Sequence, residues 1–217
     1  MSSAKISRVF IVDDHPIMRF GLSQLIQSID GVEVAGEAGT ATEALHFLDQ
    51  SLNVDLAIVD VSLPDRSGLE LIKDLRVLHE EIKCLVISSH DEEIYAERVL
   101  RAGGRGYMMK DRAPDLLETA VKQVLSGSVF LSAGMTARMM EVIAGGGSSM
   151  SVSSLSDREL EVYRAIGEGK SSREIAGVMG ISIRTVDAHR THIKEKLKVR
   201  DAVELTHSAI RWVESQN

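Results

Sequence analysis

The sequence predicts a doubly wound α/β domain with a five-stranded parallel sheet, followed by a second, smaller all-α domain. Three features of the 217 residues support this division. Five short apolar runs occur within the first 110 residues, and segments of helical length separate them. Such alternation is typical of βα units with right-handed crossovers. Beyond a glycine- and serine-rich stretch near residue 145, the chain has helical patterns and no strand-like run.

The five predicted strands are nearly uninterrupted apolar segments, which indicates a sheet covered on both faces. They comprise residues 9–12, 32–35, 56–59, 85–87 and 106–109. Apolar residues at helical spacing predict a first helix over residues 16–28, with a face formed by Ile17, Phe20, Leu25 and Ile29. Residues suited to starting the later helices are Thr40, Ser67, Asp91 and Pro114.

The segment 127–151 is predicted to connect the two domains, so that the chain divides into residues 1–126, 127–151 and 152–217. A short helix is expected early in this segment, with apolar positions at Met135, Met139, Met140, Val142 and Ile143. The pattern favours packing by these methionines over a partner-binding stripe. The glycines and serines that follow, over residues 145–149, predict a flexible linker.

Residues 152–217 are predicted to form four helices. Two capping boxes, in which a serine and a glutamate satisfy free amide groups reciprocally, begin the first two helices with Ser156–Glu159 and Ser171–Glu174. The third and fourth helices begin after Ser182 and Asp201. The short turn at residues 179–181 contains a glycine, which is typical of a helix-turn-helix unit.

Charge is distributed unevenly along the chain. The whole sequence has 25 basic and 32 acidic residues, a net charge of −7. Residues 1–145 carry 14 basic and 22 acidic residues, whereas residues 146–217 carry 11 and 10. The acidity therefore belongs to the first domain, and the second remains a candidate for binding nucleic acid. Because Phe, Tyr and Trp together number only eight, double-stranded nucleic acid is favoured over single strands.

Composition also limits the setting in which the protein acts. The one cysteine, Cys84, lies in an apolar run and is expected to be a buried, inert thiol. No apolar stretch approaches the length needed to cross a bilayer, and the first residues have no hydrophobic signal core. We therefore expect a cytoplasmic protein with no membrane partner.

Five chemically active residues stand at the ends of four predicted strands. Asp13 and Asp14 follow the first strand, Asp60 follows the third, and Ser88 and Lys110 belong to the ends of the fourth and fifth. A parallel sheet gathers these ends at one edge, where three carboxylates repel one another unless a cation lies among them. Such oxygen ligands favour Mg²⁺, and the hydroxyl and ammonium groups could neutralise a phosphoryl group. Singly, each could be an ordinary strand-end residue; together they predict phosphoryl transfer onto a carboxylate.

Over about residues 6–126, the chain resembles the receiver domain of two-component response regulators. The resemblance is carried by residues 10–15, 59–68, 87–90 and 106–110. It implies a flavodoxin-like fold in which Asp60 is the phosphoacceptor and Mg²⁺ is held by Asp13, Asp14, Asp60 and the backbone carbonyl of Ser62. It also implies that Ser88 and Lys110 hold the phosphoryl oxygens and that Ser88 and Tyr107 form a coupled switch pair. From the residues alone, Tyr107 could instead be a packed strand residue with its hydroxyl at the surface.

One departure from many receivers concerns the residue after the lysine. Those receivers have a cis-proline there, whereas this chain has Asp111, for which a trans peptide bond is expected. This form, with Pro114 three residues further on, resembles the NarL/FixJ branch. His15, beside the acidic pair, is expected to be accessory rather than a metal ligand or phosphodonor.

The densest positive stretch spans residues 183–200, with six basic and two acidic side chains. On a helix, Val186, Ile193 and Leu197 fall on one face, and most of the basic residues fall on the other. A short basic amphipathic helix could be a solvated surface, but the same shape suits a DNA major groove.

Residues 152–214 resemble the LuxR-type helix-turn-helix, through the segments 155–159, 169–176, 185–189 and 196–199. The resemblance makes the helix over residues 182–197 the DNA-reading element, with contacts expected from Arg184, Thr185, Asp187, Ala188, Arg190, Thr191, Lys194 and Lys198. The basic side chains, Lys196 included, suit phosphate contacts, and the short exposed ones suit base edges. Asp187 stands where many relatives have lysine and would favour a cytosine amino group. His189 is expected to be structural.

Together the two resemblances imply a phosphorylation-controlled transcriptional regulator. Its expected partners are a sensor histidine kinase, double-stranded promoter DNA and a second copy of the chain, with RNA polymerase a further candidate. We expect phosphorylation to release the DNA-reading helix from the receiver and to favour dimers.

Two other interpretations start from the same residues. An aspartate-nucleophile phosphatase would need a second aspartate two residues after Asp60, where Ser62 stands, so an enzyme is not expected. A DNA-binding protein whose receiver acts without phosphorylation is less favoured, because the carboxylate set is intact.

Overall fold

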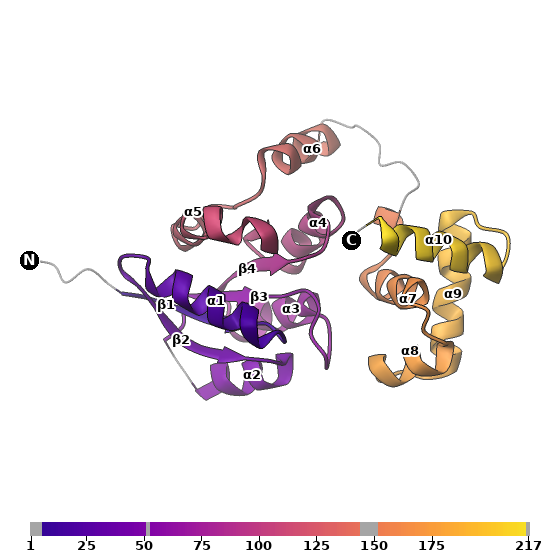
Figure 1. The fold of residues 1–217 in the computed structure, drawn as a ribbon, viewed down its shortest axis with the longest axis horizontal. Helices are drawn as coiled ribbons and strands as arrows, with labels where there is room; N and C mark the ends of the chain where they lie inside the picture. Colours follow the sequence, from indigo (N-terminus) through magenta and orange to yellow (C-terminus); the bar gives the residue numbers. More distant parts are fainter. Residues whose placement is uncertain (1–5, 51–52, 144–151, 216–217) are drawn as a thin grey trace, which may run out of the picture. The chain divides into compact units, whose positions relative to one another are not determined.

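The computed structural model describes residues 6–50, 53–143 and 152–215. The chain divides into two compact units, Met1–Met139 and Met140–Asn217 (Figure 1). The predicted glycine- and serine-rich linker lies outside the described residues. No helix in the described part of the chain is long and apolar enough to cross a membrane.

The first unit is built on a five-stranded parallel sheet in the order β2-β1-β3-β4-β5. Its strands are β1 (Ser7–Val12), β2 (Val32–Ala38), β3 (Leu56–Val59), β4 (Lys83–Ser88) and β5 (Gly106–Met109). All five predicted strands are confirmed, with β1, β2 and β4 longer than predicted. Val12 pairs with Val59, and Ser88 pairs with Met109, so neighbouring strands end at a common edge.

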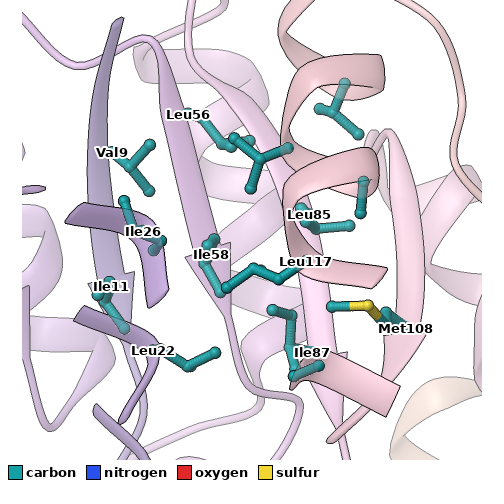
Figure 2. Packing of buried hydrophobic residues seen from close by; sticks show 14 of the residues in the cluster. Val9, Ile11, Leu22, Ile26, Leu56, Ile58, Leu85, Ile87, Met108 and Leu117 are labelled. Atoms are coloured by element: carbon teal, nitrogen blue, oxygen red, sulfur yellow. The ribbon is translucent and has the colours of Figure 1, made fainter. Parts of the chain in front are cut away.

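Helices cover both faces of the sheet. They are α1 (Pro16–Gln27), α2 (Ala41–Gln50), α3 (Gly68–Leu78), α4 (Glu92–Ala102) and α5 (Ala113–Leu125), with a 3-10 turn, η1 (Lys110–Arg112), before α5. Figure 2 shows Leu22 and Ile26 of α1 and Leu117 of α5 packed on alternate residues of the strands. On the opposite face, Phe10 stacks on Phe47 of α2, with ring centroids 4.6 Å apart. The buried apolar strands thus form a double-sided core, as predicted.

The apolar face predicted for the first helix is partly wrong. Ile17 and Phe20 are 88% and 66% exposed, whereas Leu22 and Ile26 are buried. At about 100° per residue, Ile17 and Phe20 lie roughly 150° around the helix from Leu22. Packing of Leu22 and Ile26 against the sheet therefore turns the first two apolar residues outward.

The predicted helix caps are confirmed. The Ser67 side chain accepts a hydrogen bond from the amide of Leu69, and the Asp91 side chain accepts one from Glu93. The Thr40 hydroxyl accepts from the amide of Glu43 at 3.1 Å. Pro114 lies in the first turn of α5.

A further helix, α6 (Ala133–Ile143), occurs where the sequence predicts one. The segment before it continues the first unit beyond the predicted boundary at residue 126, because Phe130 is buried and bridges to Gly106 at the edge of β5. Met135 is also buried, as expected for packing, whereas Met140 is 64% exposed.

The second unit contains a 3-10 turn, η2 (Val152–Ser154), and the helices α7 (Asp157–Gly167), α8 (Ser172–Met179), α9 (Ile183–Leu197) and α10 (Ala202–Glu214). Both predicted capping boxes form, and Ser182 and Asp201 cap α9 and α10. Gly180 ends α8 with φ +64°, a left-handed conformation that glycine adopts readily. Gly167 lets α10 approach α7, since a Cβ there would lie 2.5 Å from the Ala209 carbonyl oxygen.

Candidate phosphoacceptor site and DNA-binding helix

The predicted carboxylates meet at one edge of the sheet. Ligand atoms of Asp13, Asp14, His15 and Asp60 all lie within 4.8 Å of one another. Asp13 and Asp60 are almost completely buried. The ammonium of Lys110 bridges them, with Nζ 2.6 Å from Asp13 Oδ2 and 2.8 Å from Asp60 Oδ2. The sheet therefore brings together residues that are far apart in the sequence.

The two oxygens of Asp60 have different surroundings. Oδ2 receives the hydrogen bond from Lys110, whereas Oδ1 is buried and has no hydrogen-bond partner among the described residues. The pKa of Asp60 is raised overall: burial is the largest cause and the charge of Asp13 adds to it, while Lys110 and the nearby Ser88 hydroxyl act in the opposite direction. Burial lowers the pKa of Lys110, but Asp60 and Asp13 together raise it, so the ammonium stays charged. The site thus holds a carboxylate whose charge is only partly compensated.

We expect Asp60→Asn to raise the thermal midpoint of the first unit in magnesium-free buffer. A folded-state pKa above the unfolded value means that the charged carboxylate costs stability at neutral pH, and this cost falls as the group is protonated. The neutral side chain of asparagine has a similar shape and removes this cost. The measurement is thermal unfolding at pH 7.

Asp65→Asn is the matched control, and we expect it to lower the thermal midpoint of unfolding. Although partial burial raises the pKa of Asp65, hydrogen bonds from Thr42 and Ala41 at the start of α2 lower it overall. Its charged form therefore stabilises the fold above the unfolded pKa. A lower midpoint for Asp60→Asn, or a higher one for Asp65→Asn, would contradict this assignment.

His15 begins α1 from the same edge. Its side chain is 68% exposed, and Nδ1 lies 2.7 Å from Asp14 Oδ1. Its backbone amide donates to Asp13 Oδ1 at 2.8 Å. The backbone of His15 thus orients a buried carboxylate while the ring lies at the surface.

The predicted switch pair lies beside this site. Ser88 and Tyr107 are buried, and the Tyr107 hydroxyl donates to the backbone carbonyl of His90 at 2.6 Å. The alternative of a surface hydroxyl for Tyr107 is therefore wrong. His90 Nε2 also lies 2.7 Å from Ser62 Oγ, which connects the loop after β3 to the loop after β4. No pattern in the sequence indicates this contact of His90.

Two further residues shape the loops. Gly68 allows close packing, because a Cβ there would lie 2.0 Å from the carbonyl oxygen of Asp60. Gly68 lies within the motif of residues 59–68, whose pattern does not by itself indicate this close approach. No cis peptide bond occurs among the described residues, which confirms the trans bond expected between Lys110 and Asp111. Cys84 is buried, and burial raises the pKa of its thiol to about 12, as expected for an inert residue.

In the second unit, α9 has the predicted two faces. Val186 and Ile193 are buried and Leu197 is half-buried. The residues predicted to contact DNA are exposed or half-buried: Arg184, Thr185, Asp187, Ala188, Arg190, Thr191, Lys194 and Lys198. None of the basic ones forms an ion pair within the described parts of the chain.

Other side chains of α9 have partners inside the second unit. Lys196 Nζ lies 2.6 Å from Glu159, whose side chain is buried in the first capping box. His192 approaches the same carboxylate at 3.9 Å. Asp187 accepts a hydrogen bond from the Ser172 hydroxyl at 3.1 Å, which links α9 to α8. Lys196 therefore helps to hold α9 on α7 and is less available than its neighbours for an external anion.

Lys198 ends α9 in a left-handed conformation, with φ 54° and ψ 35°. We expect Lys198→Gly to stabilise the second unit by about 0.5–1 kcal/mol, because a side chain in this conformation costs about 1 kcal/mol that glycine avoids. Urea unfolding measures the change. Lys198→Ala removes the same charge and keeps the Cβ, so a gain of equal size in both variants would contradict the explanation by backbone conformation.

The geometry defines a parallel α/β domain with a partly buried carboxylate cluster at one edge of its sheet, followed by a helix-turn-helix domain. Residues 9–122 match the response regulator receiver domain, and residues 153–209 match the bacterial regulatory proteins of the luxR family. The chain belongs to the DNA-binding response regulators of the NarL/FixJ type. This family comprises transcriptional regulators, which favours regulation over the phosphatase interpretation.

Whole-chain relatives share this organisation. The chain is 31% identical to the response regulator UvrY of Escherichia coli K12 over 204 residues, which are 94% of this chain and 93% of UvrY. It is similar to RcsB from Salmonella enterica serovar Typhimurium bound to a promoter in the presence of the phosphomimetic BeF₃⁻, with 28% identity, a TM-score of 0.72 and coverage of 94% and 98%. A structure of two RcsB dimers on two parallel DNAs is 27% identical, with a TM-score of 0.58 and coverage of 97% and 98%.

Proposed function

We propose that Asp60 accepts a phosphoryl group from the phosphohistidine of a sensor histidine kinase. The observation that carries the proposal is the buried Asp60 Oδ1, which has no hydrogen-bond partner in the described part of the chain while Lys110 holds the other oxygen. Asp60 Oδ1 attacks the phosphorus of the phosphohistidine, the bond between phosphorus and the histidine nitrogen breaks, and the imidazole leaves. Lys110 and Ser88 then bind the oxygens of the transferred group.

The donor set suits Mg²⁺, which prefers carboxylate oxygens and retains several waters. Asp13, Asp14 and Asp60 supply three carboxylates, and the Ser62 carbonyl is the proposed fourth protein ligand. The convergence of their ligand atoms within 4.8 Å supports a cation at this edge. When bound, the ion would neutralise negative charge on the phosphoryl oxygens.

We infer that α9, capped by Ser182, enters the major groove of promoter DNA. Arg184, Arg190, Lys194 and Lys198 contact phosphates, and Thr185, Asp187, Ala188 and Thr191 face the bases. Two features support this orientation: the docked apolar face of α9, and four basic side chains that form no ion pair with any residue that the structure describes. Paired half-sites would be read by a dimer, an inference supported by the RcsB dimers on DNA.

The test measures promoter affinity with and without acetyl phosphate and Mg²⁺ at fixed salt. Higher affinity after treatment, accompanied by incorporation of phosphate, supports phosphorylation control. Equal affinities despite incorporation would favour a receiver that acts independently of phosphorylation. EDTA should abolish incorporation without removing the basal affinity for DNA.

A further inference from the structure

The segment formed by residues 128–139, here called the strap, is attached to the first unit at two places. At the first, it lies along the edge of β5. Phe130 donates its amide to the Arg105 carbonyl at 2.9 Å and accepts from the Tyr107 amide at 3.0 Å. Gly106 permits this approach, because a Cβ there would lie 2.9 Å from the Phe130 carbonyl oxygen. Since the Phe130 ring is buried in the core, this attachment is firm.

The second attachment joins the strap to the first turn of α4. The amide of Ser132 donates to Glu92 Oε1 at 2.9 Å, and Arg138 forms an ion pair with Glu93. The Ser132 hydroxyl also accepts from the Met135 amide at 3.1 Å, at the start of α6. The side chains of Arg138 and Glu93 are 45% and 66% exposed, so this attachment is the weaker one.

Both attachments adjoin the predicted switch residues. Tyr107 contacts the strap through its amide and contacts the loop before α4 through its hydroxyl, which bonds to the His90 carbonyl. Ser88 lies two residues before His90, and Asp91 caps α4. A movement of the loop after β4, residues 89–91, would therefore carry the first turn of α4, while Ser88 and β5 are held by the pairing of β4 with β5.

We propose that the strap is a phosphorylation-sensitive latch, released from Glu92 and Glu93 when the loop after β4 moves toward a phosphoryl group on Asp60. Two attachments on elements that move relative to each other cannot both persist, and the exposed one breaks first. Release changes where the chain leaves the first unit and so couples the phosphoacceptor to the DNA-binding unit. The inference rests on the proposed phosphorylation of Asp60.

Hydrogen exchange of the full-length chain tests the latch, with beryllofluoride and Mg²⁺ as the phosphoryl mimic. We expect the amides of residues 132–139 to exchange at least about fivefold faster with the mimic, the ratio expected for loss of an exposed ion pair and its adjoining hydrogen bond. Glu93→Lys and Arg138→Glu should each produce this faster exchange without the mimic and reduce the effect of phosphorylation on promoter affinity. The double variant should restore both properties.

The matched control reverses Glu118 and Lys122, an exposed ion pair on α5. These substitutions should leave both readouts unchanged. If the mimic protects residues 87–90 but leaves the exchange of residues 132–139 unchanged, the latch is wrong and the phosphoacceptor assignment stands. The latch would also be overturned if Glu93→Lys and Arg138→Glu kept the exchange rates of the parent chain and its phosphorylation-dependent gain in promoter affinity. A parent chain that takes up neither phosphate nor the mimic would overturn the proposed function and the latch together.

Discussion

Asp60→Asn should lower phosphoryl incorporation from acetyl phosphate by more than about 1,000-fold, because the amide removes the nucleophilic oxygen. Neighbouring carboxylates cannot replace it. The Asp13 carboxylate bonds to the His15 amide and lies against Lys110, and Asp14 contacts His15. The phosphodonor-dependent gain in promoter affinity should disappear with incorporation. Radiolabel retained on the protein and gel-shift affinity at fixed salt measure the two effects.

The control for this variant is Asp65→Asn, which changes the next acidic residue along the same loop. Asp65 binds the start of α2 rather than the cluster, so its variant should retain incorporation if unfolding is avoided by working well below its thermal midpoint. Phosphate found on another residue of the Asp60→Asn protein, with a preserved gain in affinity, would disprove the assignment. The higher thermal midpoint expected for Asp60→Asn separates loss of chemistry from loss of fold.

The convergence of the candidate site residues could be predicted from the sequence because these residues stand at strand ends. Once β1, β3, β4 and β5 are recognised as parallel, their shared edge brings Asp13, Asp60 and Lys110 together regardless of their separation in the sequence. The outward face of α1 was not predictable from spacing, because α1 has apolar residues on opposite sides, with Ile17 and Phe20 roughly 150° around the helix from Leu22. Packing against the sheet decides which of these residues is buried.

Contacts that depend on loop conformation were also missed. The bond between Ser62 and His90 joins two loops whose separation has no sequence pattern. The burial of Phe130 at the edge of β5 depends on the absence of a side chain at Gly106, a single residue within an apolar run. In the second unit, Lys196 pairs with Glu159. Composition alone does not distinguish Lys196 from the basic residues of α9 that form no ion pair among the described residues.

The variant with alanine at Arg184, Arg190 and Lys194 should lose about 100- to 1,000-fold in promoter affinity, because each charge-assisted contact contributes roughly tenfold. The slope of log affinity against log salt should become shallower by about 2 to 3, since each lost phosphate contact releases about 0.9 fewer counterions. The fold should persist, because none of the three belongs to the buried face formed by Val186 and Ile193. Fluorescence anisotropy across a salt series measures both quantities.

A second triple variant, with alanine at Arg101, Arg112 and Lys122, removes the same charge from exposed positions of the first unit. If α9 supplies the phosphate contacts, this control should keep the parental salt slope, because local contacts rather than net charge determine counterion release. Equal losses of slope in the two variants would assign the effect to net charge and contradict the placement of α9 in the groove. A lost slope in the α9 variant with retained phosphoryl incorporation would place the defect at DNA contact, separate from the chemistry at Asp60.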